Sequence, residues 1–281
     1  MLPGAAARSP GPPAGWDDLV VPDLPVLPAP PRLPGRAQML TWSLGSLAVS
    51  MATGVLVLGV SGSAAAAWPL FVAAWIGVLL GPPIRRARLR NLLADRRYRT
   101  VPDGQAGLAL AAALAPAGVR ALVVRAGPVS GLARNYRDGP RAVLLVHEVL
   151  LGQPDLAGFF IAHEAVHLAR NDIVRRPVVF SAALTSWVFL AFAWPVAVLA
   201  LPLLIALAAV FNQAMELSCD RQAAHWVGFD QAERALSVLV VARRREHRPP
   251  VRVIRGLLTY PSPRRRVRTV AAASALHDAT R

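Results

Sequence analysis

The segment Ala162-His163-Glu164-Ala165-Val166-His167-Leu168 carries the pattern HExxH, and it constrains how the rest of the chain folds. On a helix, His163 and His167 share one face, where two imidazoles can bind one zinc ion. The carboxylate of Glu164 can then act as general base toward a water that the metal activates. Asp172 follows soon after and can hold an imidazole in place, with a solvated helix end as its alternative. A helix that carries two histidines by chance is the alternative for the whole pattern.

A third metal ligand must come from elsewhere in the chain. Arg170 and Ile173 stand where an HExxHxxGxxH site would have its glycine and its third histidine. Glu216 and Asp220 are again four residues apart and share a helix face. One of them suits the third ligand, and the other can hold a ligand imidazole in the required tautomer. Two histidines and one carboxylate with an open fourth position are typical of catalytic zinc, whereas structural zinc usually has four protein ligands.

The composition predicts a membrane protein. Of the 281 residues, 54% are hydrophobic and 17% charged, which is too apolar for an ordinary soluble protein. The formal charge is +15, and because the sequence contains no lysine, arginine supplies all of the positive charge. Arginines that flank membrane helices on the cytoplasmic side explain this charge better than nucleic-acid binding, because no recognition motif accompanies them. The single cysteine, Cys219, excludes an intramolecular disulfide and is expected to be a small buried residue.

The N-terminal part divides into a tail and a membrane hairpin. Residues 1–38 are rich in proline and predict a disordered tail. Residues 39–82 contain two apolar runs joined by a short turn and predict a transmembrane hairpin. A cleaved signal peptide is the alternative, but the long proline-rich leader argues against it. Seven arginines between residues 85 and 99 place the end of this hairpin on the cytoplasmic side.

Residues 83–177 form the expected cytoplasmic segment that contains the HExxH helix. Residues 107–114 predict a helix, and residues 121–125 and 142–146 predict strands. The second strand either is an ordinary strand of a sheet or forms an exposed edge that pairs with an extended substrate. His147, which follows it, is expected to be a bystander.

Residues 178–211 form a second apolar stretch, which a straight helix cannot explain. Such a helix would be about 51 Å long, against a hydrocarbon core of roughly 30 Å. His167 precedes the stretch and Glu216 follows it, yet both are expected at one metal ion. The chain must therefore return, as two short spans or a membrane-dipping hairpin that turns near Trp194-Pro195. Residues 212–281 are expected to be cytoplasmic and helical, with helices over 216–227, 230–245 and 264–276.

Three motifs together resemble a known family. AHEAVHLARND, MELSCDRQAA and TYPSPRRRV, within about residues 140 to 270, resemble the HtpX-like membrane zinc metallopeptidases, gluzincins related to the CaaX prenyl endoproteases. The resemblance implies that His163, His167 and Glu216 bind the metal and that Glu164 is the base. Tyr260 stands where the family often has histidine, whereas Arg266 keeps the family spacing. In such proteases a His or Arg often stabilises the tetrahedral intermediate, and here His225 or Arg266 is the candidate.

The sequence therefore predicts a mainly α, multi-span membrane protein with a cytoplasmic gluzincin-type zinc peptidase domain that carries a small β-sheet. The expected function is zinc-dependent endopeptidase activity on membrane or misfolded proteins, with one Zn²⁺ per chain. The expected partners are protein or peptide substrates and the lipid bilayer, with no nucleic acid, and the expected location is the cell membrane. Two alternatives remain: a sensor metallopeptidase of the β-lactam-receptor kind, and a non-catalytic membrane scaffold.

Overall fold

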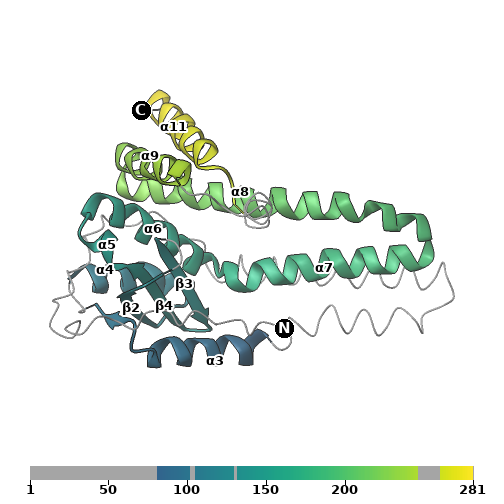
Figure 1. The fold of residues 1–281 in the computed structure, drawn as a ribbon, viewed down its shortest axis with the longest axis horizontal. Helices are drawn as coiled ribbons and strands as arrows, with labels where there is room; N and C mark the ends of the chain where they lie inside the picture. Colours follow the sequence, from purple (N-terminus) through teal and green to yellow (C-terminus); the bar gives the residue numbers. More distant parts are fainter. Residues whose placement is uncertain (1–80, 102–104, 130–131, 246–259, 281) are drawn as a thin grey trace, which may run out of the picture.

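The computed structural model describes residues 81–101, 105–129, 132–245 and 260–280, which form a mainly helical protein with one small sheet (Figure 1). The expected tail and nearly all of the first hairpin lie outside these residues. The elements in chain order are α3 (Gly81–Ala94), β1 (Arg99–Thr100), α4 (Gln105–Leu114), η2 (Ala115–Ala117), β2 (Ala121–Gly127), β3 (Ala133–Asp138), β4 (Arg141–His147), α5 (Glu148–Leu151), α6 (Pro154–Arg170), α7 (Asp172–Ala193), η3 (Pro195–Ala200), α8 (Leu201–Val227), α9 (Phe229–Arg245) and α11 (Pro263–Ala279).

The sheet has the strand order β1-β2-β4-β3 and mixes parallel and antiparallel pairs. β4 pairs with β2 in parallel and with β3 antiparallel. The two strands expected from the sequence are confirmed as β2 and β4, whereas the short β1 and the more polar β3 were not foreseen. The suggestion that residues 142–146 form an exposed edge is wrong, because β4 lies inside the sheet and the edge beside it is β3.

The side chains of β4 explain its inner position. Leu144 and Val146 point into the main core with α6, whereas Val143 and Leu145 pack on the other face with Leu89 of α3. Successive side chains of a strand point to opposite faces of the sheet. A strand that is apolar on both faces must therefore be covered on both. α6 and α3 provide these two covers.

The helix α6 carries the HExxH pattern and begins and ends at local signals. Pro154 occupies its first turn, where the missing N–H costs nothing. Asn171 adopts the left-handed conformation, with φ of 52°, and ends the helix. The buried guanidinium of Arg137 on β3 donates to the carbonyls of Leu168 at 2.5 Å and Ala117 at 2.8 Å. This contact satisfies a terminal carbonyl of α6 and holds that end of the helix against the sheet.

The second apolar stretch folds as a hairpin, as the sequence predicted. α7 runs away from the sheet, and η3 and α8 return beside it after a turn at Trp194 (Figure 1). Trp187 Nε1 on α7 donates to the carbonyl of Ala197 in η3 at 2.8 Å, which ties the two arms together. Within the described residues, the stretch Pro195–Val227 is the one helical segment long and apolar enough to cross a membrane. The multi-span architecture remains a prediction.

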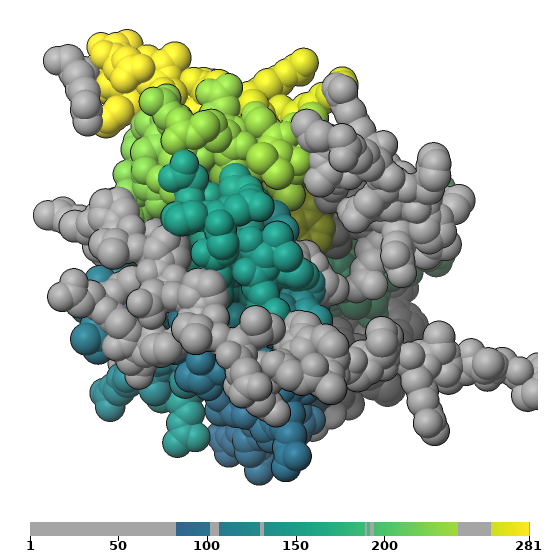
Figure 2. Space-filling model, turned by 60° about the vertical axis from the view of Figure 1, so that its left-hand side comes forward, coloured from purple at the N-terminus to yellow at the C-terminus, as the bar shows by residue number. Residues whose placement is uncertain are grey.

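The last helices close the layer above the site. α9 and α11 pack against α8, and the layers follow one another in Figure 2 from yellow α11 through green to teal and the blue α3. Ser262 caps α11 by accepting from the N–H of Arg265 at 3.3 Å, and Pro263 opens the helix. Arg265 also donates to Gln213 of α8 at 2.7 Å. The serine and the second proline of YPSPRRRV therefore form a helix start beside the site.

Candidate metal centre

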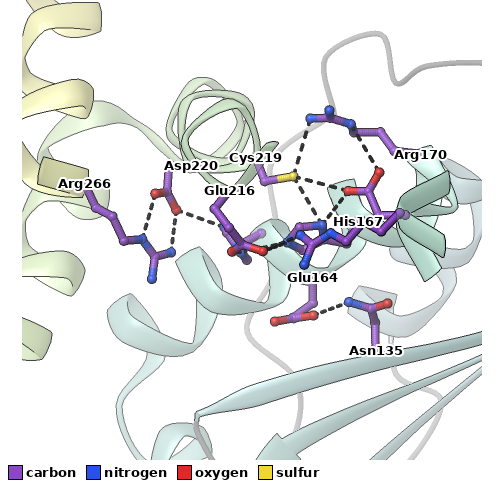
Figure 3. Close-up of polar contacts among 11 residues, drawn as sticks. Asn135, Glu164, His167, Arg170, Glu216, Cys219, Asp220 and Arg266 are labelled. Atoms are coloured by element: carbon purple, nitrogen blue, oxygen red, sulfur yellow. Dashed lines mark hydrogen bonds and ion pairs between the residues drawn. The ribbon is translucent and has the colours of Figure 1, made fainter. Parts of the chain in front are cut away.

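Three side chains from two helices converge on one point. His163 and His167 of α6 have their Nε2 atoms 3.1 Å apart. Glu216 of α8 faces both, with Oε2 3.4 Å from His163 Nε2 and Oε1 3.5 Å from His167 Nε2. All three side chains are buried. The return of the chain through the hairpin brings α8 beside α6 (Figure 1), and Figure 3 shows His167 and Glu216 side by side.

The spacing of these donor atoms fits zinc. Ligands at about 2.0–2.1 Å in a tetrahedral shell are separated from one another by about 3.3 Å. The three observed separations, 3.1, 3.4 and 3.5 Å, lie close to this value. Two neutral imidazoles and one carboxylate are also the donor set of a catalytic zinc site with an open position. The residues present therefore fit the ion.

Asp220 holds the first imidazole from behind. Its Oδ1 lies 2.9 Å from His163 Nδ1, on the ring edge away from the convergence point. The carboxylate is itself held by Arg266 of α11, whose Nε lies 2.7 Å from Oδ2 and whose NH2 lies 2.5 Å from Oδ1. Such a contact fixes the ring orientation and the tautomer that leaves Nε2 free for a metal.

Asp172 holds the second imidazole in the same way. It opens α7 directly after the left-handed Asn171, and this reversal turns its Oδ2 to within 2.6 Å of His167 Nδ1. Cys219 Sγ lies 3.4 Å from the same ring nitrogen. The prediction that Cys219 is buried is confirmed, but its position against a ligand imidazole was not foreseen.

His167, Asp172 and Cys219 form a second group that could hold a metal ion. A guanidinium already faces this group, because Arg170 lies 3.5 Å from the Cys219 sulfur and 3.7 Å from Asp172 Oδ1. The group with Glu216 also has a guanidinium partner, Arg176, so this feature does not separate the two. Only the group with Glu216 brings both histidines together through their Nε2 atoms, so it is the candidate that fits the HExxH pattern.

The electrostatics of the site favour positive charge at the imidazoles. Burial opposes protonation of His163, but the carboxylates of Asp220 and Glu216 outweigh it and raise the pKa of the ring to about 9. Burial likewise opposes protonation of His167, while Cys219 and Asp172 raise its pKa well above the ordinary value. A bound cation would interact favourably with the same carboxylates that raise these pKa values.

Glu164 lies on the side of α6 that faces the sheet (Figure 3). Asn135 of the edge strand β3 donates through Nδ2 to Glu164 Oε2. The carboxylate is half-buried and is not one of the three converging side chains. Sequence reasoning missed Asn135. The only signal for it was an amide side chain in the short polar segment ARNYRD.

Arg176 was also missed. It lies on α7 and pairs through NH2 with Glu216 Oε1, so the third converging side chain has a cationic partner of its own. In the sequence Arg176 appears as part of a basic pair before an apolar run, which resembles an ordinary membrane flank. Its neighbour Arg175 behaves differently and lies over the ring of Phe211 at 5.8 Å.

The two candidates for stabilising an intermediate lie in different places. Arg266 is 13% exposed and bonds Asp220, so it acts on His163 through that carboxylate. His225 lies further along α8 and packs against Phe229 and His277, with ring centroids 4.8 and 5.6 Å away. The described contacts therefore connect Arg266 with the site and leave His225 outside it.

Comparisons with known proteins add nothing to this geometry: no family model, no curated protein and no solved structure matches the chain.

Proposed function

We propose that this protein is a membrane-associated, zinc-dependent endopeptidase. The observation that carries the proposal is the convergence of His163, His167 and Glu216 at tetrahedral spacing, with Glu164 next to the first of them on α6. When bound, zinc would supply Lewis acidity to a water and to the scissile carbonyl. The metal would be held by Nε2 of both histidines and by the Glu216 carboxylate.

The other site residues have separate tasks in this proposal. Glu164 takes a proton from the attacking water at its carboxylate and delivers it to the leaving amine. Asn135 holds that carboxylate through Oε2. Asp220 and Asp172 keep the two imidazoles oriented through their Nδ1 atoms.

The edge strand β3 offers a place for the substrate backbone. Among the described strands it pairs with β4 alone, and Asn135 on it reaches Glu164. An extended peptide that added to this edge would run past the general base with its backbone hydrogen-bonded. Recognition through backbone groups suits a protease with broad sequence tolerance toward unfolded or membrane-anchored polypeptides.

The membrane placement rests on the hairpin. Its arms present apolar side chains outward, and the catalytic elements lie together at its base (Figure 1). The arginine-rich α3 packs on the sheet beside the candidate metal centre, and under the positive-inside rule its arginines support a cytoplasmic location for the centre.

The proposal is tested by metal content and turnover together. Purified wild-type protein is expected to contain about one zinc per chain and to cleave unfolded casein, with loss of cleavage in chelator and recovery on adding zinc. Glu164→Gln is expected to keep its zinc and to lose about 10²–10⁴-fold in rate, because only the general base is removed.

The matched control is Glu233→Gln, which removes an exposed carboxylate on α9. It is expected to match wild type in both measurements. Zinc-free wild-type protein, or Glu164→Gln that cleaves at the wild-type rate, would contradict the proposal. Zinc binding without cleavage by the wild type would favour the scaffold alternative.

A further inference from the structure

The hairpin of α7, η3 and α8 has its charge at one end only. No charged residue occurs between residues 177 and 213. At the base, Arg175 lies over Phe211, Arg176 pairs with Glu216, and Arg265 of α11 bonds Gln213. At the turn, the sequence WPVAVLALP contains no charged, amide or hydroxyl side chain. Turns that emerge into water are rich in Gly, Pro, Asn, Asp and Ser, and of these residues this turn contains only proline.

The polarity of the hairpin is inverted relative to a soluble helical pair. Ser181 and Thr185 are buried, with 9% and 0% of their surface exposed. The exposed positions are large apolar side chains: Phe180, Trp194, Val196, Val198, Leu199, Leu203, Ile205, Leu207 and Val210. The hydroxyl groups of the hairpin are buried and its aliphatic side chains are exposed. This arrangement suits the interior of a bilayer, because lipid tails are as apolar as leucine.

Several backbone groups of the turn are paired within the hairpin. Trp194 N–H donates to the carbonyl of Leu190 at 2.8 Å, and Ala197 N–H donates to that of Trp194 at 2.8 Å. Pro195 and Pro202 bring no N–H to satisfy. The indole N–H of Trp187 is bonded inward to the carbonyl of Ala197. Internal pairing of this kind is required in hydrocarbon, where an unpaired backbone group costs several kcal/mol.

The length of the arms limits their reach. The apolar part of α7, residues 177 to 193, rises about 25 Å at 1.5 Å per residue. The return arm, residues 195 to 211, rises about 28 Å when its 3₁₀ part is counted at 2.0 Å per residue. The hydrocarbon core is about 30 Å thick, and any tilt shortens the reach further. The helical stretch Pro195–Val227 has the length to cross a membrane, but it includes the polar base from Asn212 onward; the apolar part of each arm alone is shorter than the hydrocarbon core, so it does not carry the turn through the far headgroups into water.

We infer that the hairpin enters and leaves the bilayer through the face on which the metal centre lies, and that its turn stays out of the water on the far side. Its partner is the acyl-chain interior of the bilayer. The inference rests on the membrane placement in the proposed function, but it does not depend on zinc or on catalysis. It predicts a membrane-dipping anchor where the sequence also allowed two complete spans.

Cysteine accessibility tests this inference. Val196→Cys and Leu199→Cys place a thiol at the exposed turn, and Arg90→Cys places one on the exposed surface of α3 as the matched control. A membrane-impermeant maleimide is applied to intact cells and to inverted membrane vesicles, with the wild-type chain as the blank for the buried Cys219. Both turn cysteines are expected to react in neither preparation and to react fully after detergent, whereas Arg90→Cys reacts in the vesicles without detergent.

Two outcomes would overturn the inference, and they differ in meaning. Reaction of the turn cysteines from the side opposite to Arg90→Cys would show that the hairpin crosses the bilayer completely. Reaction from the same side as Arg90→Cys, without detergent, would show that the hairpin lies outside the bilayer and would also remove the membrane placement. Casein cleavage by the turn variants in detergent reports separately on the peptidase part of the proposal.

Discussion

At the residue scale, three acidic side chains at the candidate metal centre each face an arginine from another position in the fold. Glu216 pairs with Arg176 of α7, Asp220 with Arg266 of α11, and Asp172 lies beside Arg170. A buried carboxylate without a partner is costly, so these arginines allow three negative charges to lie around two imidazoles. The first two pairs join segments that are far apart in the chain. Asp172 and Arg170 lie on either side of the turn at Asn171.

Asp220 therefore contacts both His163 and Arg266, and its removal should affect both contacts. In Asp220→Ala, His163 loses the acceptor at Nδ1, and zinc affinity is expected to fall about 10–100-fold with residual casein cleavage. Arg266 also loses its partner, and stranding one member of a buried pair costs about 3–5 kcal/mol. A chelator titration and the unfolding temperature measure the two effects.

The matched control is Asp230→Ala, which removes an exposed carboxylate from α9. A double variant, Asp220→Ala with Arg266→Gln, should regain part of the unfolding temperature but not the zinc affinity, because the stranded charge is gone while the acceptor is not restored. If Asp220→Ala retains zinc as Asp230→Ala does, then Asp220 does not orient His163.

At the element scale, the position of β3 decides how the base is held. β3 forms the edge of the sheet beside α6, and this contact brings Asn135 to the carboxylate of Glu164. The same strand carries Arg137, which donates to the end of α6 at Leu168. A short strand thus fixes both the axial position of the HExxH helix and the orientation of its glutamate.

Asn135→Ala should lower turnover while leaving the metal in place. A hydrogen bond to a charged group contributes about 1.5–3 kcal/mol, so its loss is expected to reduce casein cleavage roughly 10–100-fold. Zinc content should stay at the wild-type value, because the described contacts of Asn135 do not include a metal ligand. Arg134→Ala, an exposed neighbour on the same strand, is the control. Equal loss in both variants would mean that strand β3 acts on the site only through its fold.

At the scale of the whole molecule, the metal would connect helices α6 and α8. α6 and α8 are separated in sequence by the entire apolar hairpin, and the three converging side chains meet across their interface. A ligand that binds only the folded state stabilises it by about 2.7 kcal/mol when present at 100 times its dissociation constant.

Metal removal should accordingly lower the unfolding temperature in detergent, followed through tryptophan fluorescence. Glu164→Gln is expected to show the same zinc-dependent increase as wild type, since it keeps the ligands. Glu216→Ala is expected to show almost none, since the third ligand is gone. A zinc-dependent increase of wild-type size in Glu216→Ala would place the metal at another group, and that of His167, Asp172 and Cys219 would be the first to examine.

Those parts of the protein that follow from short-range spacing could be predicted from the amino-acid sequence. The i, i+4 pairs His163/His167 and Glu216/Asp220 fixed which side chains share helix faces, and the requirement that they meet predicted the return of the apolar stretch. Local breaks such as Trp194-Pro195 and Gly228 set the ends of helices, because proline and glycine act on the backbone nearby.

Which distant groups meet became visible only in the folded chain. β4 was recognisable as a strand, but whether it lay at the edge depended on pairing with the polar β3, which carries little strand signal of its own. Arg176, Asn135 and Cys219 reach the site through contacts between elements, and in sequence an arginine or asparagine looks the same whether it is solvated or paired. Long-range packing supplies that information, since the free energy of a buried pair depends on the partner and not on the neighbours in the chain.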